Sequence, residues 1–213
     1  MKKHRLCALL LVLTALPACA LAGGLEALDG FMRGVKSARA DFTQVVTAPL
    51  RQGEATARSK ISTGTFEFQR PNRFRFVYKK PFEQSIVSDG QTLWLHDVDL
   101  NQVSTRPLGQ ALQGTPAVIL SATSIAALQA SFNLQDAPDK AGLQWVTATP
   151  RNKDGPLQAI AVGFKGEQLA TLEILDSFGQ RSVMSFSQLE VNPALTAGVF
   201  SFKPPAGVDV LRQ

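Results

Sequence analysis

Residues that commonly do chemistry are scarce in this sequence of 213 residues. Its only cysteines, Cys7 and Cys19, lie near the N-terminus, and its only histidines are His4 and His96. A nucleophile of the triad type needs a histidine beside it, and a zinc site needs several cysteines or histidines. The phosphate-binding patterns GxxxxGK(S/T) and GxGxxG are absent. We therefore predict no enzymatic activity, no metal site and no cofactor.

The acidic residues beside His96 do not change this prediction. Asp97 and Asp99 stand in the stretch LWLHDVD, where a strand pattern gives way to a turn. Aspartate is common in turns because its carboxylate accepts hydrogen bonds from nearby backbone N–H groups. We interpret both as turn residues rather than a catalytic pair, and His96 as exposed or locally hydrogen-bonded.

Arg70 is the polar residue that most needs an explanation. It interrupts the stretch TFEFQRPNRFRFVY, in which the aromatic residues fall at every second position. Alternation of this kind is typical of strands and places these rings on one face: Phe66, Phe68, Phe74, Phe76 and Tyr78. A guanidinium beside such rings keeps its charge and needs several acceptors. Two interpretations stay open: Arg70 binds free carbonyls at the end of a covering helix, or it reaches solvent from a strand end.

The element that precedes these strands is predicted to be an amphipathic helix from residue 24 to about residue 40. Apolar residues recur there at three- and four-residue spacing, with lysine and arginine on the other side. They are Leu25, Leu28, Phe31, Met32, Val35 and Ala38.

Alternating segments predict strands along most of the remaining chain. They are residues 42–46, 56–68, 73–78, 84–88, 92–96 and 102–105, and then 144–149, 157–164, 169–176 and 181–191. Turn sequences such as SDGQ join them, which favours hairpins and an antiparallel sheet. The C-terminal stretch GVFSFKPPAGVDVL predicts a strand, a stop at the two prolines and a final extended piece.

The middle of the chain breaks this rhythm. The stretch TPAVILSATSIAALQASF predicts one or two short helices over residues 117–132, with Thr115 as N-cap and Pro116 at the first helical position. Two apolar helical segments, residues 25–38 and 117–132, are thus available to cover one end of a barrel formed by the strands. About ten strands in one open sheet leave costly edges, so we expect a barrel, complete or nearly so, in a single domain. Its inner rings either fill a core or line a closed apolar space.

The N-terminus predicts the compartment. Lys2, Lys3 and Arg5 precede the apolar run 6–16, and Ala20-Leu21-Ala22 fits a signal-peptidase site, so we expect residues 1–22 to be a cleaved signal peptide. The mature chain, 23–213, would keep 19 basic and 17 acidic residues, a net charge of +2. That is too small a charge for a nucleic-acid-binding surface. One alternative stays open: LPAC resembles a lipobox, in which Cys19 would carry lipid.

Five motifs in order resemble the periplasmic outer-membrane lipoprotein carrier family from about residue 25 to the C-terminus. They are ADFTQVV, GTFEFQRPNRFRFVY, IVSDGQTLWLHDVDLNQV, TPAVILS and FSFKPPAGV. The resemblance implies a mainly β fold, an unclosed antiparallel half-barrel with a helical lid over an apolar cavity. It also implies a carrier that takes lipoproteins from an inner-membrane ATP-driven transporter and passes them to an outer-membrane acceptor.

The resemblance also implies roles for individual residues. The lid-holding arginine of the family falls on Arg70, and its neighbouring aromatic on Phe74, whereas His96 stands where the family often has an aromatic residue. We expect the acyl-chain cavity to be lined by Leu28, Phe31, Phe66, Phe68, Phe74, Phe76, Trp94, Val118 and Ile119. We expect a periplasmic monomer with lipoproteins as cargo and no nucleic acid. The alternatives are an outer-membrane acceptor of the same fold acylated at Cys19, or a periplasmic sensor of lipids or small ligands.

Overall fold

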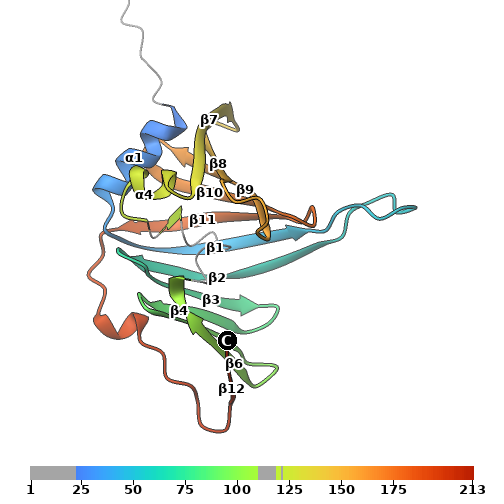
Figure 1. Cartoon of the computed structure of the whole chain (residues 1–213), viewed down its shortest axis with the longest axis vertical. Helices are drawn as coiled ribbons and strands as arrows, with labels where there is room; N and C mark the ends of the chain where they lie inside the picture. Colours follow the sequence, from blue (N-terminus) through green and yellow to red (C-terminus); the bar gives the residue numbers. More distant parts are fainter. Residues whose placement is uncertain (1–22, 110–118, 121) are drawn as a thin grey trace, which may run out of the picture.

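The computed structural model describes residues 23–109, 119–120 and 122–213 (Figure 1). The predicted signal peptide, Thr115, Pro116 and Val118 lie outside these residues. The helices described over their full length are α1 (Gly24–Gly34), α4 (Ile125–Gln129) and the 3-10 helix η1 (Ala197–Phe200), and residues 108–109 and 119–120 are also helical. The strands are β1 (Ser37–Thr47), β2 (Ser59–Gln69), β3 (Arg73–Lys80), β4 (Gln84–Asp89), β5 (Thr92–Asp97), β6 (Gln102–Pro107), β7 (Phe132–Lys140), β8 (Leu143–Pro150), β9 (Leu157–Lys165), β10 (Gln168–Asp176), β11 (Arg181–Val191) and β12 (Asp209–Arg212).

All twelve strands form one curved sheet in the order β12-β6-β5-β4-β3-β2-β1-β11-β10-β9-β8-β7. Every neighbouring pair is antiparallel except β12 and β6, which run parallel. The sheet does not close, because β12 and β7 stand at its two ends. The predicted mainly β, unclosed antiparallel half-barrel is therefore confirmed. α1 and α4 lie on the same side of the sheet (Figure 1).

The first helix is shorter than the sequence predicted. α1 ends at Gly34, and Val35 already has extended backbone angles, φ −104° and ψ 107°. Ala38 belongs to β1, where it lies buried on the same face as Phe42. The prediction was wrong because an apolar residue at position 38 satisfies a helical spacing from Val35 and a strand spacing toward Phe42 equally well.

The middle of the chain holds short helices, as the sequence predicted, at residues 119–120 and in α4, but the end of this segment and the C-terminus differ from the prediction. α4 has only five residues and is capped by Ser124, whose Oγ accepts a hydrogen bond from Ala127 N. Phe132 is not helical but begins β7, a strand that the sequence analysis missed. Its sequence FNLQDAPDK is mostly polar and contains a proline, as edge strands often do. Residues 197–200 form η1 rather than the predicted strand, whereas the final extended piece is β12.

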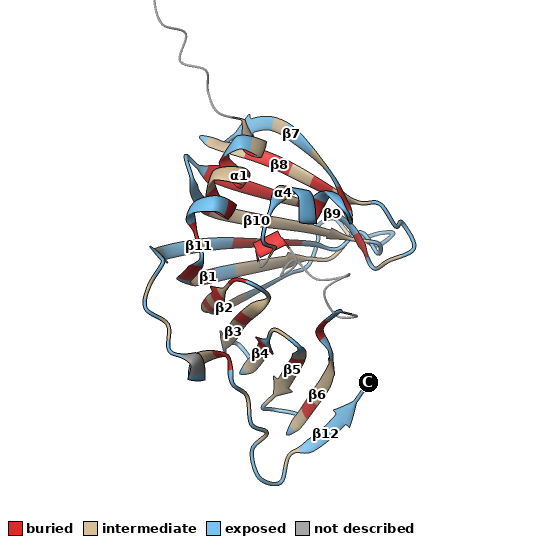
Figure 2. Cartoon of the chain, turned by 60° about the vertical axis from the view of Figure 1, so that its left-hand side comes forward, coloured by how far each residue is buried: buried red, intermediate tan, exposed pale blue. Residues whose placement is uncertain are grey.

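The main core lies between the concave face of the sheet and the covering helices. The concave face is the one that carries Phe66, Phe68, Phe74 and Phe76, and the strand register keeps these side chains together. Phe66 stands opposite Phe76, and Phe68 opposite Phe74. Figure 2 shows buried stretches of strand under α1 and α4, and further ones on β3 to β6.

Trp94 lies on the opposite face, so its assignment to the cavity was wrong. Phe76 stands opposite Ile86, which stands opposite Leu95, and these side chains point inward. Trp94 is the neighbour of Leu95 and pairs with Val87, so it points outward. There its ring lies 6.0 Å from that of Phe202, which also lies 5.8 Å from His96. The C-terminal segment thus covers the outer face of β5.

Candidate functional site

The aromatic residues of the concave face contact one another directly. The ring centroids of Phe66 and Phe76 are 4.4 Å apart and nearly stacked, and those of Phe66 and Phe68 are 5.7 Å apart. Gly64 leaves room for the next ring in the row, because a Cβ there would lie 2.8 Å from Phe42 Cζ. Phe42 in turn meets Tyr78 at 5.0 Å. The rings form one continuous apolar stripe across β1, β2 and β3.

α1 lies directly on this surface. Leu28, Phe31 and Met32 are each 1% exposed. The Phe31 ring is 6.1 Å from that of Phe68 and 5.8 Å from that of Phe164 on β9. The helix therefore occupies space between the two halves of the sheet.

Most of the predicted cavity residues come together in this one buried cluster. Its members include Leu28, Phe31, Phe66, Phe68, Phe74, Phe76 and Ile119. Trp94 is not among them, and Val118 lies outside the described residues. The cluster also contains residues that the sequence analysis did not name, such as Phe42 and Phe164. Phe42 could have been found from its alternation with Ala38 and Ala40 along β1.

Arg70 sits at the edge of the cluster, in the turn after β2, and is only 9% exposed. Its Nε donates to the carbonyl of Val35, at the end of α1, over 2.9 Å. Its Nη1 donates to the carbonyl of Ala122, three residues before α4 begins. The Arg70 backbone N–H donates to Lys36 O over 2.8 Å. One side chain therefore links the end of α1 to the segment that leads into α4.

The guanidinium of Arg70 is held in an apolar setting. Its Cζ lies 5.5 Å from the ring centroid of Phe31 and 5.1 Å from that of Phe68. Burial lowers the pKa of Arg70 from 12.5 to about 10, which still leaves the side chain cationic at neutral pH. Its Nη2 is buried and has no hydrogen-bond partner among the described residues. Among the described residues, the Arg70 guanidinium is thus a buried charge with one nitrogen unpaired, an arrangement that costs free energy.

Asn192, just after β11, also holds the end of α1. Its Oδ1 accepts hydrogen bonds from the backbone N–H groups of Lys36 and Ser37, at 2.7 and 3.3 Å. Its Nδ2 donates to Gly34 O at 2.9 Å. Asn192 has a φ of 54°, a conformation that asparagine tolerates better than most residues. Nothing local in the sequence could reveal contacts between residues so far apart in the chain.

Beyond Phe42 and Tyr78, the apolar stripe runs into an open cleft of about 570 Å³. Lys60 Nζ lies 4.5 Å above the ring of Phe82 at this cleft. Burial raises the pKa of Tyr78 to about 12. The lining combines apolar and charged side chains: Gln44, Val46, Lys60, Ser62, Tyr78, Pro81, Phe82, Gln84, Asp97, Asp99 and Leu100.

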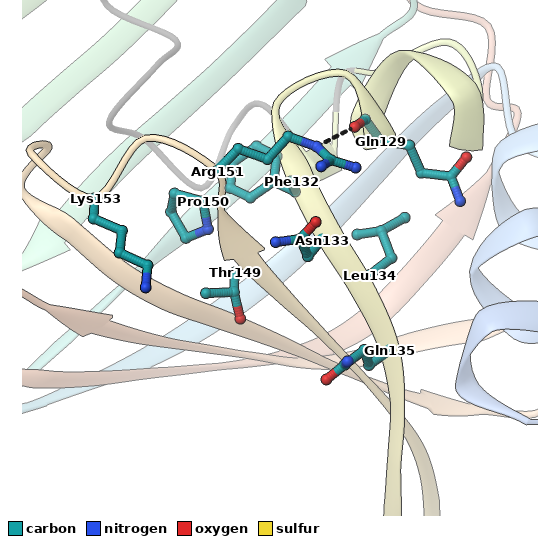
Figure 3. A pocket seen from close by; sticks show the side chains of 9 residues that line it. All are labelled: Gln129, Phe132, Asn133, Leu134, Gln135, Thr149, Pro150, Arg151 and Lys153. Atoms are coloured by element: carbon teal, nitrogen blue, oxygen red, sulfur yellow. Dashed lines mark hydrogen bonds between the residues drawn. The ribbon is translucent and has the colours of Figure 1, made fainter.

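A second pocket of about 440 Å³ lies at the β7–β8 edge of the sheet (Figure 3). Phe132 and Leu134 lie beside polar side chains there, and Arg151 Nε donates to Gln129 O over 2.8 Å. This bond ties the end of α4 to the residue after β8. Within the described part of the chain, no helix is long and apolar enough to cross a membrane, and no cluster of side chains suits a metal ion.

Comparisons with known proteins agree with this architecture. The family model of the outer membrane lipoprotein carrier protein LolA matches residues 33–203. An outer-membrane lipoprotein carrier protein from Albidiferax ferrireducens is 64% identical over 197 residues, covering 90% of this chain and 92% of that protein. The protein of that name from Neisseria meningitidis serogroup B is 41% identical over 213 residues, covering 99% of each chain.

Solved structures extend the likeness at the level of the fold alone. An uncharacterized conserved protein from Thermus thermophilus aligns with a TM-score of 0.50 at 13% identity, over 89% of this chain and 98% of its own. The sequence matches are far closer and span most of both chains. The extent of the family match, with the 64% identity, shows that this chain belongs to the LolA family of outer membrane lipoprotein carrier proteins.

Proposed function

We propose that this protein is a non-catalytic periplasmic carrier, which shields the acyl chains of lipoproteins between the two membranes of a Gram-negative cell. It receives them from an inner-membrane ATP-driven transporter and delivers them to an outer-membrane acceptor. The observation that supports this most directly is Arg70, a buried cation whose side chain bonds carbonyls beside both covering helices. Membership of the carrier family gives the cargo class.

The concave face supplies the apolar surface that such cargo requires. Each methylene moved from water to an apolar surrounding gains about 0.8 kcal/mol, so lipid chains do not cross an aqueous space unshielded. In the closed state the rings of Phe31, Phe66 and Phe68 pack against one another. Cargo therefore enters only when a covering segment moves away and acyl chains replace its contacts.

Arg70 gives the carrier a means of release. If loading breaks the bond of Arg70 to Ala122, the free energy of that bond opposes loading. A hydrogen bond to a charged group contributes about 1.5–3 kcal/mol, so one such bond would lower the affinity for cargo roughly 10- to 100-fold. A carrier weakened in this way passes its cargo to an acceptor that binds more tightly.

The test is a two-step transfer assay with purified chains. The natural chain should take triacylated lipoprotein from a releasing membrane and pass it to the acceptor. Arg70→Leu should still load but transfer poorly, because the empty closed state loses its bonds. Arg33→Leu is the matched control, since Arg33 is exposed on α1 and pairs only with Asp29 among the described residues. Failure of the natural chain to load would refute the carrier function, whereas normal transfer by Arg70→Leu would refute the switch alone.

A further inference from the structure

The start of α1 lies against a carboxylate of β7. Leu25 N donates to Asp136 Oδ1 over 2.8 Å. A Cβ built on Gly23 would lie 2.8 Å from Asp136 Oδ1 and 3.2 Å from Oδ2. Since N and Cβ of one residue are about 2.5 Å apart, Gly23 N lies no more than about 5.3 Å from Oδ1. In the described part of the chain, no lysine or arginine forms an ion pair with Asp136.

We infer that removal of the predicted signal peptide creates an ion pair between the new α-ammonium of Gly23 and Asp136, which fixes the start of α1 to β7 only in the processed chain. A signal peptidase breaks the bond between Ala22 C and Gly23 N with one water molecule. The hydroxyl goes to the Ala22 carbonyl, which leaves as a carboxylate, and Gly23 N becomes an ammonium. An α-amino group with a pKa of about 8 is mostly charged at pH 7.

Two further features of the site suit this pair. A positive charge at a helix N-terminus is repelled by the helix dipole, so an ammonium there needs a carboxylate beside it. Asp136 faces it from β7, and Glu26 stands in the first turn of α1. Gly24 lets the chain come close enough, because a Cβ there would lie 2.1 Å from Trp145 O on β8.

The pair completes a set of anchors at both ends of α1. Arg70 and Asn192 hold the C-terminal end of the helix, whereas Asp136 holds its start. In the unprocessed chain the N-terminal anchor would have the Leu25 N–H bond alone. That these anchors hold a cover over the cargo site rests on the proposed carrier function. The ion pair itself does not rest on that function, and it is tested without cargo.

The experiment is a double-mutant cycle on amide hydrogen exchange in α1. Four purified chains are compared: one beginning at Gly23 and one with two alanines before Gly23, each with Asp136 or with Asp136→Asn. Asparagine keeps an oxygen for Leu25 N–H but has no charge. Exchange in α1 should be about two- to five-fold faster with Asp136→Asn in the chain beginning at Gly23. The increase should be clearly smaller in the extended chain, where the change removes only the interaction of the carboxylate with the helix dipole and the Leu25 N–H. Exchange in β1 is the internal reference.

A matched control and two adverse outcomes complete the design. Asp139→Asn, on an exposed residue of the same strand, should leave α1 exchange unchanged in both chains. Acetylation of Gly23 should reproduce the effect of the two alanines. An equal effect of Asp136→Asn in both chains would overturn the inference. A mature periplasmic protein whose mass shows a start at lipid-modified Cys19 would overturn it too, while leaving cargo transfer to be decided by its own assay.

Discussion

The two described helices that lie over the concave face are held in very different ways. α1 has eleven residues, buries Leu28, Phe31 and Met32, and is bonded at both ends by side chains of other elements. α4 has five residues and buries only Leu128. Helices this short have little stability of their own and depend on tertiary contacts. From this difference we propose that α1 is a fixed wall and that the α4 segment, residues 122–130, is the cover that Arg70 holds shut.

The largest test of this comparison is a pair of core truncations. Phe31→Ala should lower the free energy of unfolding by about 3–5 kcal/mol, because Phe31 fills the space between Phe68 and Phe164. Leu128→Ala should cost less, about 2 kcal/mol, since the short α4 segment can shift to fill the gap. Urea unfolding followed by tryptophan fluorescence measures both. Equal losses would contradict the division into wall and cover.

Asn192 offers an intermediate test, at the end of α1. Asn192→Gly keeps the φ of 54° accessible but removes hydrogen bonds to Gly34, Lys36 and Ser37. We expect a loss of about 1–2 kcal/mol in the free energy of unfolding, and faster amide exchange at the end of α1. Exchange in α4 should not change. Faster exchange in α4 alone would reverse the roles assigned to the two helices.

The sequence predicts features that depend on a pattern within one short segment, and it fails for features that depend on pairing between segments. The alternation of Phe66, Phe68, Phe74 and Phe76 placed these rings on one face because a strand has a period of two. The stretch LWL is apolar at three successive positions, so it could not show that Trp94 points away from these rings; that depends on the pairing of β5 with β4. The apolar pattern of the predicted helix extends to Phe132, so the sequence analysis could not show that this residue begins the edge strand β7.

Contacts between distant residues set the limit for the candidate site. The sequence left open whether Arg70 binds helix-end carbonyls or solvent, and the structure shows its bonds to Val35 O and Ala122 O. Asp136 on β7 and Asn192 just after β11 contact α1 although they lie far from it in the chain. The sequence around each of these two residues is typical of a turn or an edge strand, so no local pattern predicts that they hold α1.

Tyr78 serves as a reference point at the cleft, away from α1 and α4. It is the sole tyrosine of the chain, so its absorbance reports one ring. Because burial raises its pKa from 10.0 to about 12, the folded chain retains a proton there that the unfolded chain loses. The resulting stability is complete below pH 10 and is lost as the pH rises through 12. At about pH 11 the loss is about 1 kcal/mol.

The measurement compares urea midpoints of the natural chain and Tyr78→Phe at about pH 9 and about pH 11. Tyr78→Phe should lose about 1 kcal/mol less than the natural chain over this interval. In Arg70→Leu the absorbance titration of Tyr78 should stay near its pKa of about 12, because opening the α4 segment does not reach the cleft. If the pKa of Tyr78 fell to the ordinary tyrosine value in Arg70→Leu, movement of the α4 segment would expose the cleft, and the two regions would not be independent.

The smallest expected effect concerns the other tie of the α4 segment, the bond from Arg151 to Gln129 O. This bond is exposed, so Arg151→Ala should change the free energy of unfolding by less than about 0.5 kcal/mol. It should still speed exchange in α4, because Arg70 alone would then hold that segment among the side chains described. Lys153→Ala is the control, since Lys153 lines the same pocket in Figure 3 but makes no hydrogen bond to α4 there. Should Arg151→Ala leave α4 exchange unchanged while Arg70→Leu raises it, Arg70 would be the one side chain of the two that keeps the cover closed.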